Sequence, residues 1–538
     1  MNDYNIKQLY EEMEMELISS MQRNLSRHLK EEDKVGFKFS QWQAEKLKEL
    51  KRYQRQNASI IGKYTKGLNK KISKHMQEEL LQGSKDAIKQ YNKYNDDKKK
   101  INKTLNKSFF RTNDKKVNAL INSVNNDLKT ANTGALRMIN DEYRQIIHKS
   151  AFFNANGIKT EQQAAAMATN EILDLKKIAM QSVDKASKSF LAGGLNCIEY
   201  SNGRRVNIAS YSEMAVRTAS LRAHLMGEGN FRKSIGNPLV QATSHGTACP
   251  ICQVWEGHIF IDDVYSGGTK EDGNYTLLSE AMADGFLHPN CRHGLTTYYP
   301  ELEGTSYDKE EEFNENEDIQ NKINYYDRQE KKFDRLATGS IYPDNVKYYE
   351  SKQEEVQNKI NLLDLIKETR ETISEEFQNR TKGVKIRLFN EKYSKFVEDE
   401  NKIYVGTDTD KYLLIHELGH KLQSTFTKRE KKLYNKIIKN KFSVYSYSDF
   451  KKIKSTVKDI DGNDIYYFRL KDYSKFVSKY QTRIYDWPTN FIKNKVNTDF
   501  ALEYFSEGIM FYYKNPVLLK EKDFELYEFI KEIVEKWI

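Results

Sequence analysis

Two groups of residues in this 538-residue chain have the types and spacing of metal ligands. The first lies in KYLLIHELGHKLQST, residues 411–425. His416 and His420 are four residues apart, so on a helix they share a face and can bind one zinc ion. Glu417 then lies beside the metal and can take a proton from the water that zinc activates. This pattern is typical of a zinc peptidase.

A catalytic zinc needs three protein ligands and an open position for water, so a third ligand must come from elsewhere. The stretch DFALEYFSEGIMFYY predicts a helix with Glu503 and, one turn later, Glu507. Glu503 is the predicted third ligand, and Glu507 can accept a hydrogen bond from a ligating histidine and fix its orientation. The oxyanion donor stays unassigned. Tyr480 and Tyr485 lie in the right part of the chain, but the chain has 34 tyrosines.

The second group lies in SHGTACPICQVWEGHIF and LHPNCRHGL. These stretches contain the candidate ligands His245, Cys249, Cys252, His258, His288, Cys291 and His293. A Cys-x2-Cys turn offers two thiolates to one tetrahedral ion, and a distant Cys and His can complete a structural zinc site. The most economical set is Cys249, Cys252 and Cys291 with either His288 or His293. The alternative is a reduced, metal-free hairpin packed around Trp255.

The elements that must position these residues can be predicted from the patterns between them. Residues 1–190 read as long helices, because apolar residues recur every three or four positions. Residues 191–305 mix short strands, turns and one helix, and they hold the Cys and His group. Residues 306–379 predict a polar helical linker. In residues 380–538, VKIRLF and KIYVG predict strands before the His416 helix. The expected fold is multidomain, mainly α with α+β parts.

Composition narrows the class of protein. The net charge is +10, and lysines gather in runs such as DDKKKINKTLNK and KRYQRQN. Such runs can contact DNA phosphates without sequence readout, although a solvated helix face is the favoured interpretation. No stretch approaches the roughly 20 apolar residues of a membrane span. The acidic N-terminus does not fit a signal peptide, so we expect synthesis in the cytoplasm.

The stretches YSEMAVRTAS, SHGTACPICQVWEGHIF and HPNCRHGLTTYYPE resemble the head-morphogenesis, or minor capsid, proteins of tailed bacteriophages. The opening LYEEMEMELISSMQRNLSRHLK is similar to the same group in phages of Gram-positive bacteria. The resemblance covers residues 1–305. It implies a virion protein inside the head or at the portal, with portal and capsid proteins as partners and a structural role for the Cys and His residues.

HELGH and EYFSEGIMFYY resemble the gluzincins, and the second stretch is similar to the catalytic domain of anthrax lethal factor and its toxin relatives. The match is good only at these two helices. It implies zinc ligands His416, His420 and Glu503, with Glu417 as general base. The gap between the helices is longer than in compact gluzincins, which predicts an inserted subdomain. KIYVG lies where zincins carry the edge strand that holds substrate.

Three functions are compatible with these patterns. The leading hypothesis is a phage minor capsid protein that carries a zinc metalloendopeptidase as cargo for the infected cell. The second is a maturation protease that trims head proteins inside the prohead. The third is a structural, DNA-contacting head protein with an inactive zincin-like tail. The sequence names neither the host nor the peptide or protein substrate.

Overall fold

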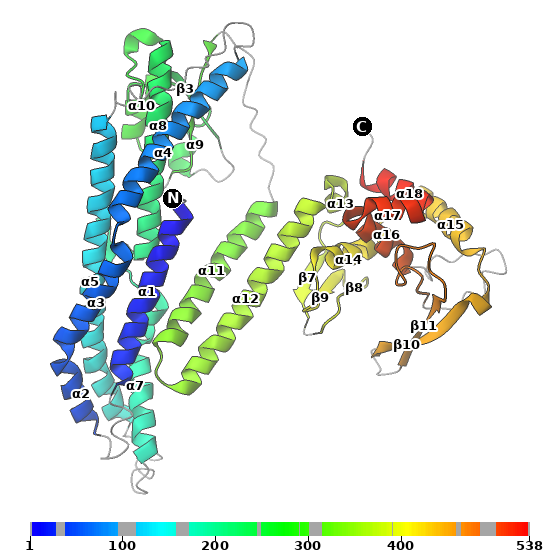
Figure 1. Ribbon diagram of the computed structural model, residues 1–538, viewed down its shortest axis with the longest axis horizontal. Coiled ribbons are helices and arrows are strands. Elements are labelled where there is room, and N and C mark those ends of the chain that lie inside the picture. Colours follow the sequence, from blue (N-terminus) through cyan, green and yellow to red (C-terminus); the bar gives the residue numbers. More distant parts are fainter. Residues whose placement is uncertain are drawn as a thin grey trace. The chain divides into compact units, whose positions relative to one another are not determined.

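The computed structural model describes residues 3–27, 38–94, 114–157, 172–244, 249–289, 291–300, 315–389, 391–458, 464–484 and 502–535. Within these residues the chain is mostly helical with small sheets (Figure 1). It divides into two compact units, residues 1–313 with 329–353 and residues 314–328 with 354–538. The predicted fold class is confirmed at this level of a mainly helical chain with small α+β parts.

Long helices build the first unit. They are α1 (Asp3–Ser26), α2 (Phe39–Lys48), α3 (Leu50–Thr65), α4 (Leu68–Tyr94), α5 (Asp114–Gly157), α7 (Ile172–Gly193) and α8 (Ile208–Ile235). The apolar stripe of α1 is buried from Ile6 to Leu25, as its periodicity predicts. A short hairpin, β1 (Ile198–Glu199) and β2 (Arg205–Val206), precedes α8. No helix in the described part of the chain is both long and apolar enough to cross a membrane.

Two further helices, α11 (Glu315–Gly339) and α12 (Pro343–Thr372), have residues in both units. The turn between them is fixed to α7 by the buried carboxylate of Asp184. This carboxylate accepts hydrogen bonds from the amides of Ile341 and Tyr342 at 2.8 and 3.2 Å. These bonds satisfy the buried backbone amides of the two residues that precede α12. Part of the predicted linker is therefore anchored in the first unit.

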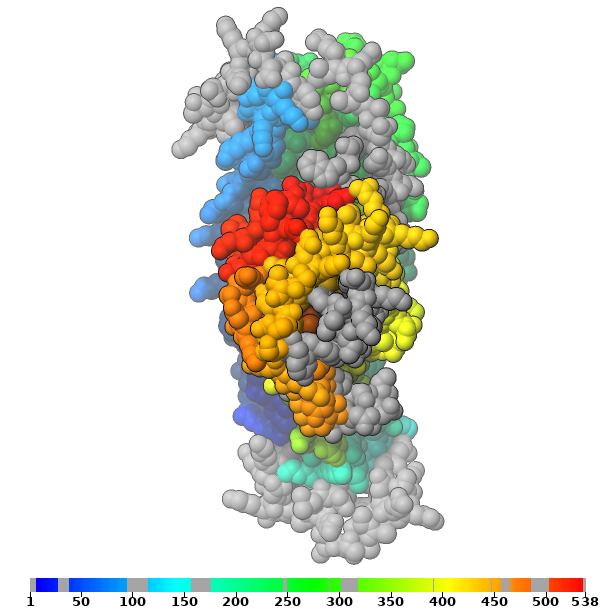
Figure 2. All heavy atoms as spheres, turned by 90° about the vertical axis from the view of Figure 1, so that its right-hand side faces the viewer, coloured from blue at the N-terminus to red at the C-terminus, as the bar shows by residue number. Residues whose placement is uncertain are grey.

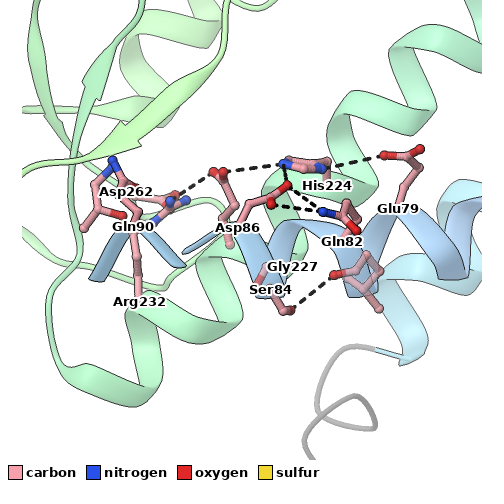
Figure 3. A network of polar contacts seen from close by, with 12 residues as sticks. Glu79, Gln82, Ser84, Asp86, Gln90, His224, Gly227, Arg232 and Asp262 are labelled. Atoms are coloured by element: carbon pink, nitrogen blue, oxygen red, sulfur yellow. Dashed lines mark hydrogen bonds and ion pairs between the residues drawn. The ribbon is translucent and has the colours of Figure 1, made fainter. Parts of the chain in front are cut away.

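Helices α4 and α8 cross at close range because glycines take the contact positions. A Cβ added at Gly83 would overlap the carbonyl oxygen of His224, and one at Gly227 would overlap that of Leu80. The hydroxyl of Ser84 donates a hydrogen bond to the carbonyl of Gly227 at 2.9 Å across the crossing (Figure 3). The backbones therefore pack directly on each other.

A charged network flanks this crossing. His224 lies 3.5–3.8 Å from the carboxylates of Glu228, Glu79 and Asp86 (Figure 3). The hydrogen bond with Glu228, together with the charges of the other two acids, raises the pKa of His224 against the opposing effect of burial. The network continues through the fully buried Arg232, which binds Glu228 at 3.2 Å. Side chains of opposite charge are thus paired along the α4–α8 contact.

A small sheet ordered β5-β4-β3-β6 follows α8. Its strands are β3 (Leu239–Ala242), β4 (Ile259–Ile261), β5 (Thr276–Leu277) and β6 (Leu295–Thr297). The connections contain α9 (Pro250–Gln253), a 3-10 helix (Lys270–Asp272) and α10 (Leu278–Ala283). Val240, Phe260 and Phe286 lie in the small core of this region.

After α12, the second unit continues with α13 (Glu375–Arg380) and a sheet ordered β7-β9-β8. Its strands are β7 (Lys385–Leu388), β8 (Lys395–Val397) and β9 (Lys402–Val405). KIYVG was predicted to form an edge strand, but it forms β9, the central strand, parallel to β7 and antiparallel to β8. The sequence could not show this order, because both neighbours precede β9 in the chain.

Helices and one hairpin complete this unit. They are α14 (Lys411–Ser424), α15 (Lys428–Phe442), a 3-10 helix (Tyr447–Asp449), β10 (Phe450–Lys458), β11 (Asp464–Leu470), α16 (Leu502–Lys514), α17 (Pro516–Lys522) and α18 (Phe524–Val534). Figure 2 shows atoms of the β10–β11 hairpin, in orange, at the surface of the unit. This hairpin and α15 lie in the predicted insertion between the two helices of the candidate site.

Replacing Gly83 by alanine should destabilise the first unit, because the added methyl group would force α4 and α8 apart. We expect a loss of about 1–3 kcal/mol in the free energy of unfolding, as for other overpacked positions. Gly62→Ala in α3 is the matched control, since a Cβ there meets nothing within 4 Å. Urea unfolding followed by circular dichroism measures both. Equal midpoints for the two variants would contradict the close crossing.

Candidate metal centre

Helix α14 carries both histidines and the glutamate of the motif. The side chain of Asp410 caps the helix by accepting a hydrogen bond from the amide of Leu413 at 2.8 Å. His416 and Glu417 are buried, at 4% and 8% exposure. Leu413, nearly one turn before His416, is 42% exposed.

Helix α16 approaches α14 at Gly419. A Cβ on Gly419 would lie 2.7 Å from Cγ2 of Ile509 and 3.1 Å from Cα of Ser506. The space that glycine leaves is therefore filled by α16. This contact brings Glu503 and Glu507, each 5% exposed, to the histidines of α14.

Three donor atoms converge between these helices. Oε2 of Glu503 lies 3.1 Å from Nε2 of His416 and 3.6 Å from Nε2 of His420. The other ring nitrogen of His416, Nδ1, lies 3.3 Å from Oε1 of Glu507. The structure thus brings together the three predicted ligands, and it places Glu507 behind His416.

The electrostatics of this group favour a positive charge. Burial would lower the pKa of His416, but the carboxylates of Glu503 and Glu507 raise it to about 10. Burial would raise the pKa of Glu503, but hydrogen bonds with His416 and His420 hold it well below its usual range. A cation beside Glu503 is therefore stabilised.

The donor set fits a catalytic zinc ion. Two imidazole nitrogens and one carboxylate oxygen are ligands that catalytic zinc sites use, with a fourth position left for water. Glu507, on the far nitrogen of His416, would fix the ring orientation and direct Nε2 to the metal. His416, His420 and Glu503 would hold the ion.

Glu417 lies next to these ligands. Burial raises the pKa of its carboxyl group, against the effect of the neighbouring His420 and His416. The backbone amide of Phe396, in the edge strand β8, donates a hydrogen bond to it. A carboxyl group with a raised pKa beside a metal site is suited to accept and return a proton.

A loop after β11 places Ser478 beside the candidate site, together with Tyr480. The hydroxyl of Ser478 donates a hydrogen bond to Oε2 of Glu507 and accepts bonds from the amides of Tyr480 and Gln481, each at 3.1 Å. The ring of Tyr480 lies 5.6 Å from that of His416, centroid to centroid. Tyr485, the other candidate oxyanion donor, lies outside the described residues. Ser478 carries no sequence signature, because only the folded loop gives it a partner.

The Cys and His group of the first unit also comes together, and its cysteines are all free thiols. Sγ of Cys249 lies 3.2 Å from Nε2 of His288. Sγ of Cys252 lies 3.7 Å from Sγ of Cys291. Nδ1 of His293 lies 3.2 Å from Sγ of Cys291. Both histidines that the spacing left open therefore face a sulfur.

The remaining candidates of that group are not ligands in this arrangement. The ring of His258 packs against Trp255 at 5.8 Å and Phe260 at 6.4 Å. It belongs to neither Cys and His cluster of the described residues. His245 lies outside the described residues. Trp255 packs at the edge of the small core, as in the alternative of a metal-free hairpin around this residue. The same fold also brings the sulfurs together.

Comparison with known proteins identifies one part of the chain. The model of a family described as phage minor capsid protein 2 matches residues 3–367. Neither the curated proteins nor the solved structures gave a significant match. The matched range contains the Cys and His group and ends before α14.

Ser478→Ala removes the hydroxyl that holds Glu507, so the zinc affinity of the α14–α16 site should fall about tenfold to a hundredfold, as for other lost partners of metal ligands. Competition with a zinc chelator on the full chain measures the affinity, and His416→Ala identifies which binding step belongs to this site. Ser424→Ala is the control, because the Ser424 hydroxyl bonds to the Lys421 carbonyl at an exposed position. An unchanged affinity in Ser478→Ala would mean that Glu507 needs no support from the loop.

Proposed function

The chain belongs to the phage minor capsid protein 2 family, and on that premise we propose that it is a head protein of the virion that carries a zinc metallopeptidase. The first unit serves as the structural part and contacts portal and capsid proteins. The second unit is the enzyme. The observation that carries the enzymatic proposal is the convergence of His416, His420 and Glu503 on one point, with Glu417 beside them.

The residues around this point have complementary chemical roles. A bound zinc ion would polarise a peptide carbonyl and make water acidic enough to lose a proton near neutral pH. With the ion bound, Glu417 would accept that proton on its carboxylate and return it to the leaving amine. The ring of Tyr480 lies beside that of His416, so its hydroxyl would be the donor to the oxyanion. Glu507 and Ser478 keep the ring of His416 in place.

The position of the site in the chain supports the cargo hypothesis over the maturation protease. The family match ends at residue 367, and the whole candidate centre lies beyond it. A peptidase needed for head assembly would be expected within the part that the family shares. We therefore favour an enzyme that enters the host cell with the phage DNA and cuts a peptide or protein there.

DNA contact is a separate part of the proposal. In α3, the lysine and arginine run KRYQRQN exposes Lys51, Arg52 and Arg55 to solvent. Arg52 also binds Glu49 of the preceding turn at 2.7 Å. The run DDKKKINKTLNK lies outside the described residues. The exposed charges of α3 support weak, sequence-independent contact with packaged DNA.

Glu417→Gln should abolish peptidase activity, with a loss of about a hundredfold or more, because the amide cannot accept the proton. Zinc should stay bound, since Glu417 is not a ligand, whereas His416→Ala should lose both zinc and activity. The full chain is incubated with a mixed peptide library, new termini are counted by mass spectrometry, and bound zinc is measured on the same samples. Native-like cleavage by Glu417→Gln would overturn the peptidase proposal.

The same variant, placed in the phage, separates the hypotheses. Under the cargo hypothesis, Glu417→Gln particles assemble and process their head proteins normally but lose an effect on the infected cell. Unprocessed head proteins would instead establish the maturation protease. Particles that behave like native phage in both respects would support the inactive tail.

Tyr480→Phe should lower kcat about a hundredfold to a thousandfold, the range for loss of one oxyanion donor, with little change in KM. Arg483 holds the ring in place, because its guanidinium lies 3.6 Å from the Tyr480 centroid and 4.5 Å from that of Tyr467. Tyr467→Phe is the matched control, since it keeps a ring beside Arg483. Steady-state kinetics on a peptide from the library measure both variants, and equal kcat values would exclude Tyr480 as the donor.

A further inference from the structure

We propose that the Cys and His group of the first unit is a closed structural zinc site with Cys249, Cys252, Cys291 and His293 as ligands. The group joins two segments. Cys249 directly precedes α9, and Cys252 lies within it. Cys291 and His293 lie between α10 and β6. The proposal is independent of the peptidase, because it concerns a different unit and a site without an open position for water.

The distance between two of the sulfurs fits a shared ion. Sγ of Cys252 and Sγ of Cys291 are 3.7 Å apart. A disulfide would require about 2.05 Å. With zinc–sulfur bonds of about 2.3 Å, two ligands of a tetrahedral ion lie about 3.8 Å apart. The two sulfurs therefore have the spacing of neighbouring ligands of one tetrahedral metal.

Each of the three sulfurs accepts a hydrogen bond from a backbone amide. The donors are the amides of Cys252 for Cys249, of Leu287 for Cys252, and of His293 for Cys291, the last at 3.4 Å. Amides directed at sulfur are the arrangement that would stabilise a metal-bound thiolate, although burial opposes a free thiolate at Cys252. The ligand atoms fall into two groups that share Cys252, one with Cys249 and His288 and one with Cys291 and His293, and within each group they lie within 4.8 Å of one another. A cation beside Cys252 would therefore be close to both groups.

The backbone is strained at Leu287, whose amide donates the hydrogen bond to Cys252. Leu287 has a φ of 55°, in the left-handed region that side-chain-bearing residues rarely adopt. Such strain persists only where surrounding interactions enforce it. At Leu287 the conformation directs the amide to Cys252 immediately before the segment that supplies His288 and Cys291.

The surroundings select His293 as the fourth ligand. Nε2 of His293 lies 3.0 Å from Oε1 of Glu256, whose side chain is 5% exposed. A neutral ring that donates its proton from Nε2 to this carboxylate would leave the lone pair of Nδ1 facing Cys291. A carboxylate behind a metal-binding histidine is a common arrangement. His293 is buried together with Cys252 and Cys291, whereas His288 and Cys249 are of intermediate burial at the edge of the group. His288 packs beside Cys249 and would lie outside the four ligands.

Cobalt substitution of the full chain tests this assignment, because Co²⁺ bound by thiolates has a strong charge-transfer absorption that a site of histidines and carboxylates lacks. The native chain should show this absorption. His416→Ala should keep it, which separates this site from the peptidase site. Cys252→Ser and His293→Ala should lose it, and His288→Ala should retain it. No absorption in the native chain overturns the site, and loss in His288→Ala with retention in His293→Ala overturns the choice of histidine.

A second measurement needs no variant and so does not depend on folding of a mutant. The native chain, loaded with zinc, is treated with iodoacetamide before and after removal of zinc by a chelator, and modified cysteines are identified by mass spectrometry. Cys249, Cys252 and Cys291 should react at least tenfold faster after chelation. Cys197, whose thiol bonds to the carbonyl of Ala131, is the internal control and should not change. Equal rates for the three cysteines in both states would contradict the zinc site.

Discussion

The candidate catalytic centre depends on how closely α14 and α16 approach each other at Gly419. Any side chain at this position would meet Ile509 and the backbone of Ser506 and push the helices apart. Glu503 lies on α16 less than one turn before Ser506, so the same displacement would carry its carboxylate away from His416 and His420. A single packing contact between two helices thus sets the distances from Glu503 to both histidines.

The two groups of candidate ligands would use the same ion in opposite ways. Between α14 and α16 the donors are two imidazoles and a carboxylate, and the carboxyl group of Glu417 lies beside them. In the first unit the proposed donors are three sulfurs and the imidazole of His293, and the carboxylate of Glu256 is paired with that imidazole. The first arrangement suits turnover, and the second suits holding segments together in a region with a small core.

The ligands of the second unit could be predicted from sequence because helical spacing alone puts His416 and His420, and Glu503 and Glu507, on common faces. Ser478 could not, because it reaches Glu507 from a loop whose path depends on the whole unit. The order of the β7-β9-β8 sheet was equally hidden, since strand length and pattern do not show which neighbour pairs with which. In the first unit, the spacing identified the three cysteines but left His288 and His293 as alternatives for the fourth ligand. The carboxylate of Glu256 beside His293 distinguishes them.

Helix α12 runs without interruption from Pro343 to Thr372. The boundary between the compact units falls inside it, after residue 353, and the family match ends inside it, at residue 367. At residue 353 the chain therefore passes into the second unit within a continuous helix. A change in the length of α12 turns the chain that follows by about 100° for each residue added or removed. A change of about seven residues, close to two full turns, alters the register by only about 20°.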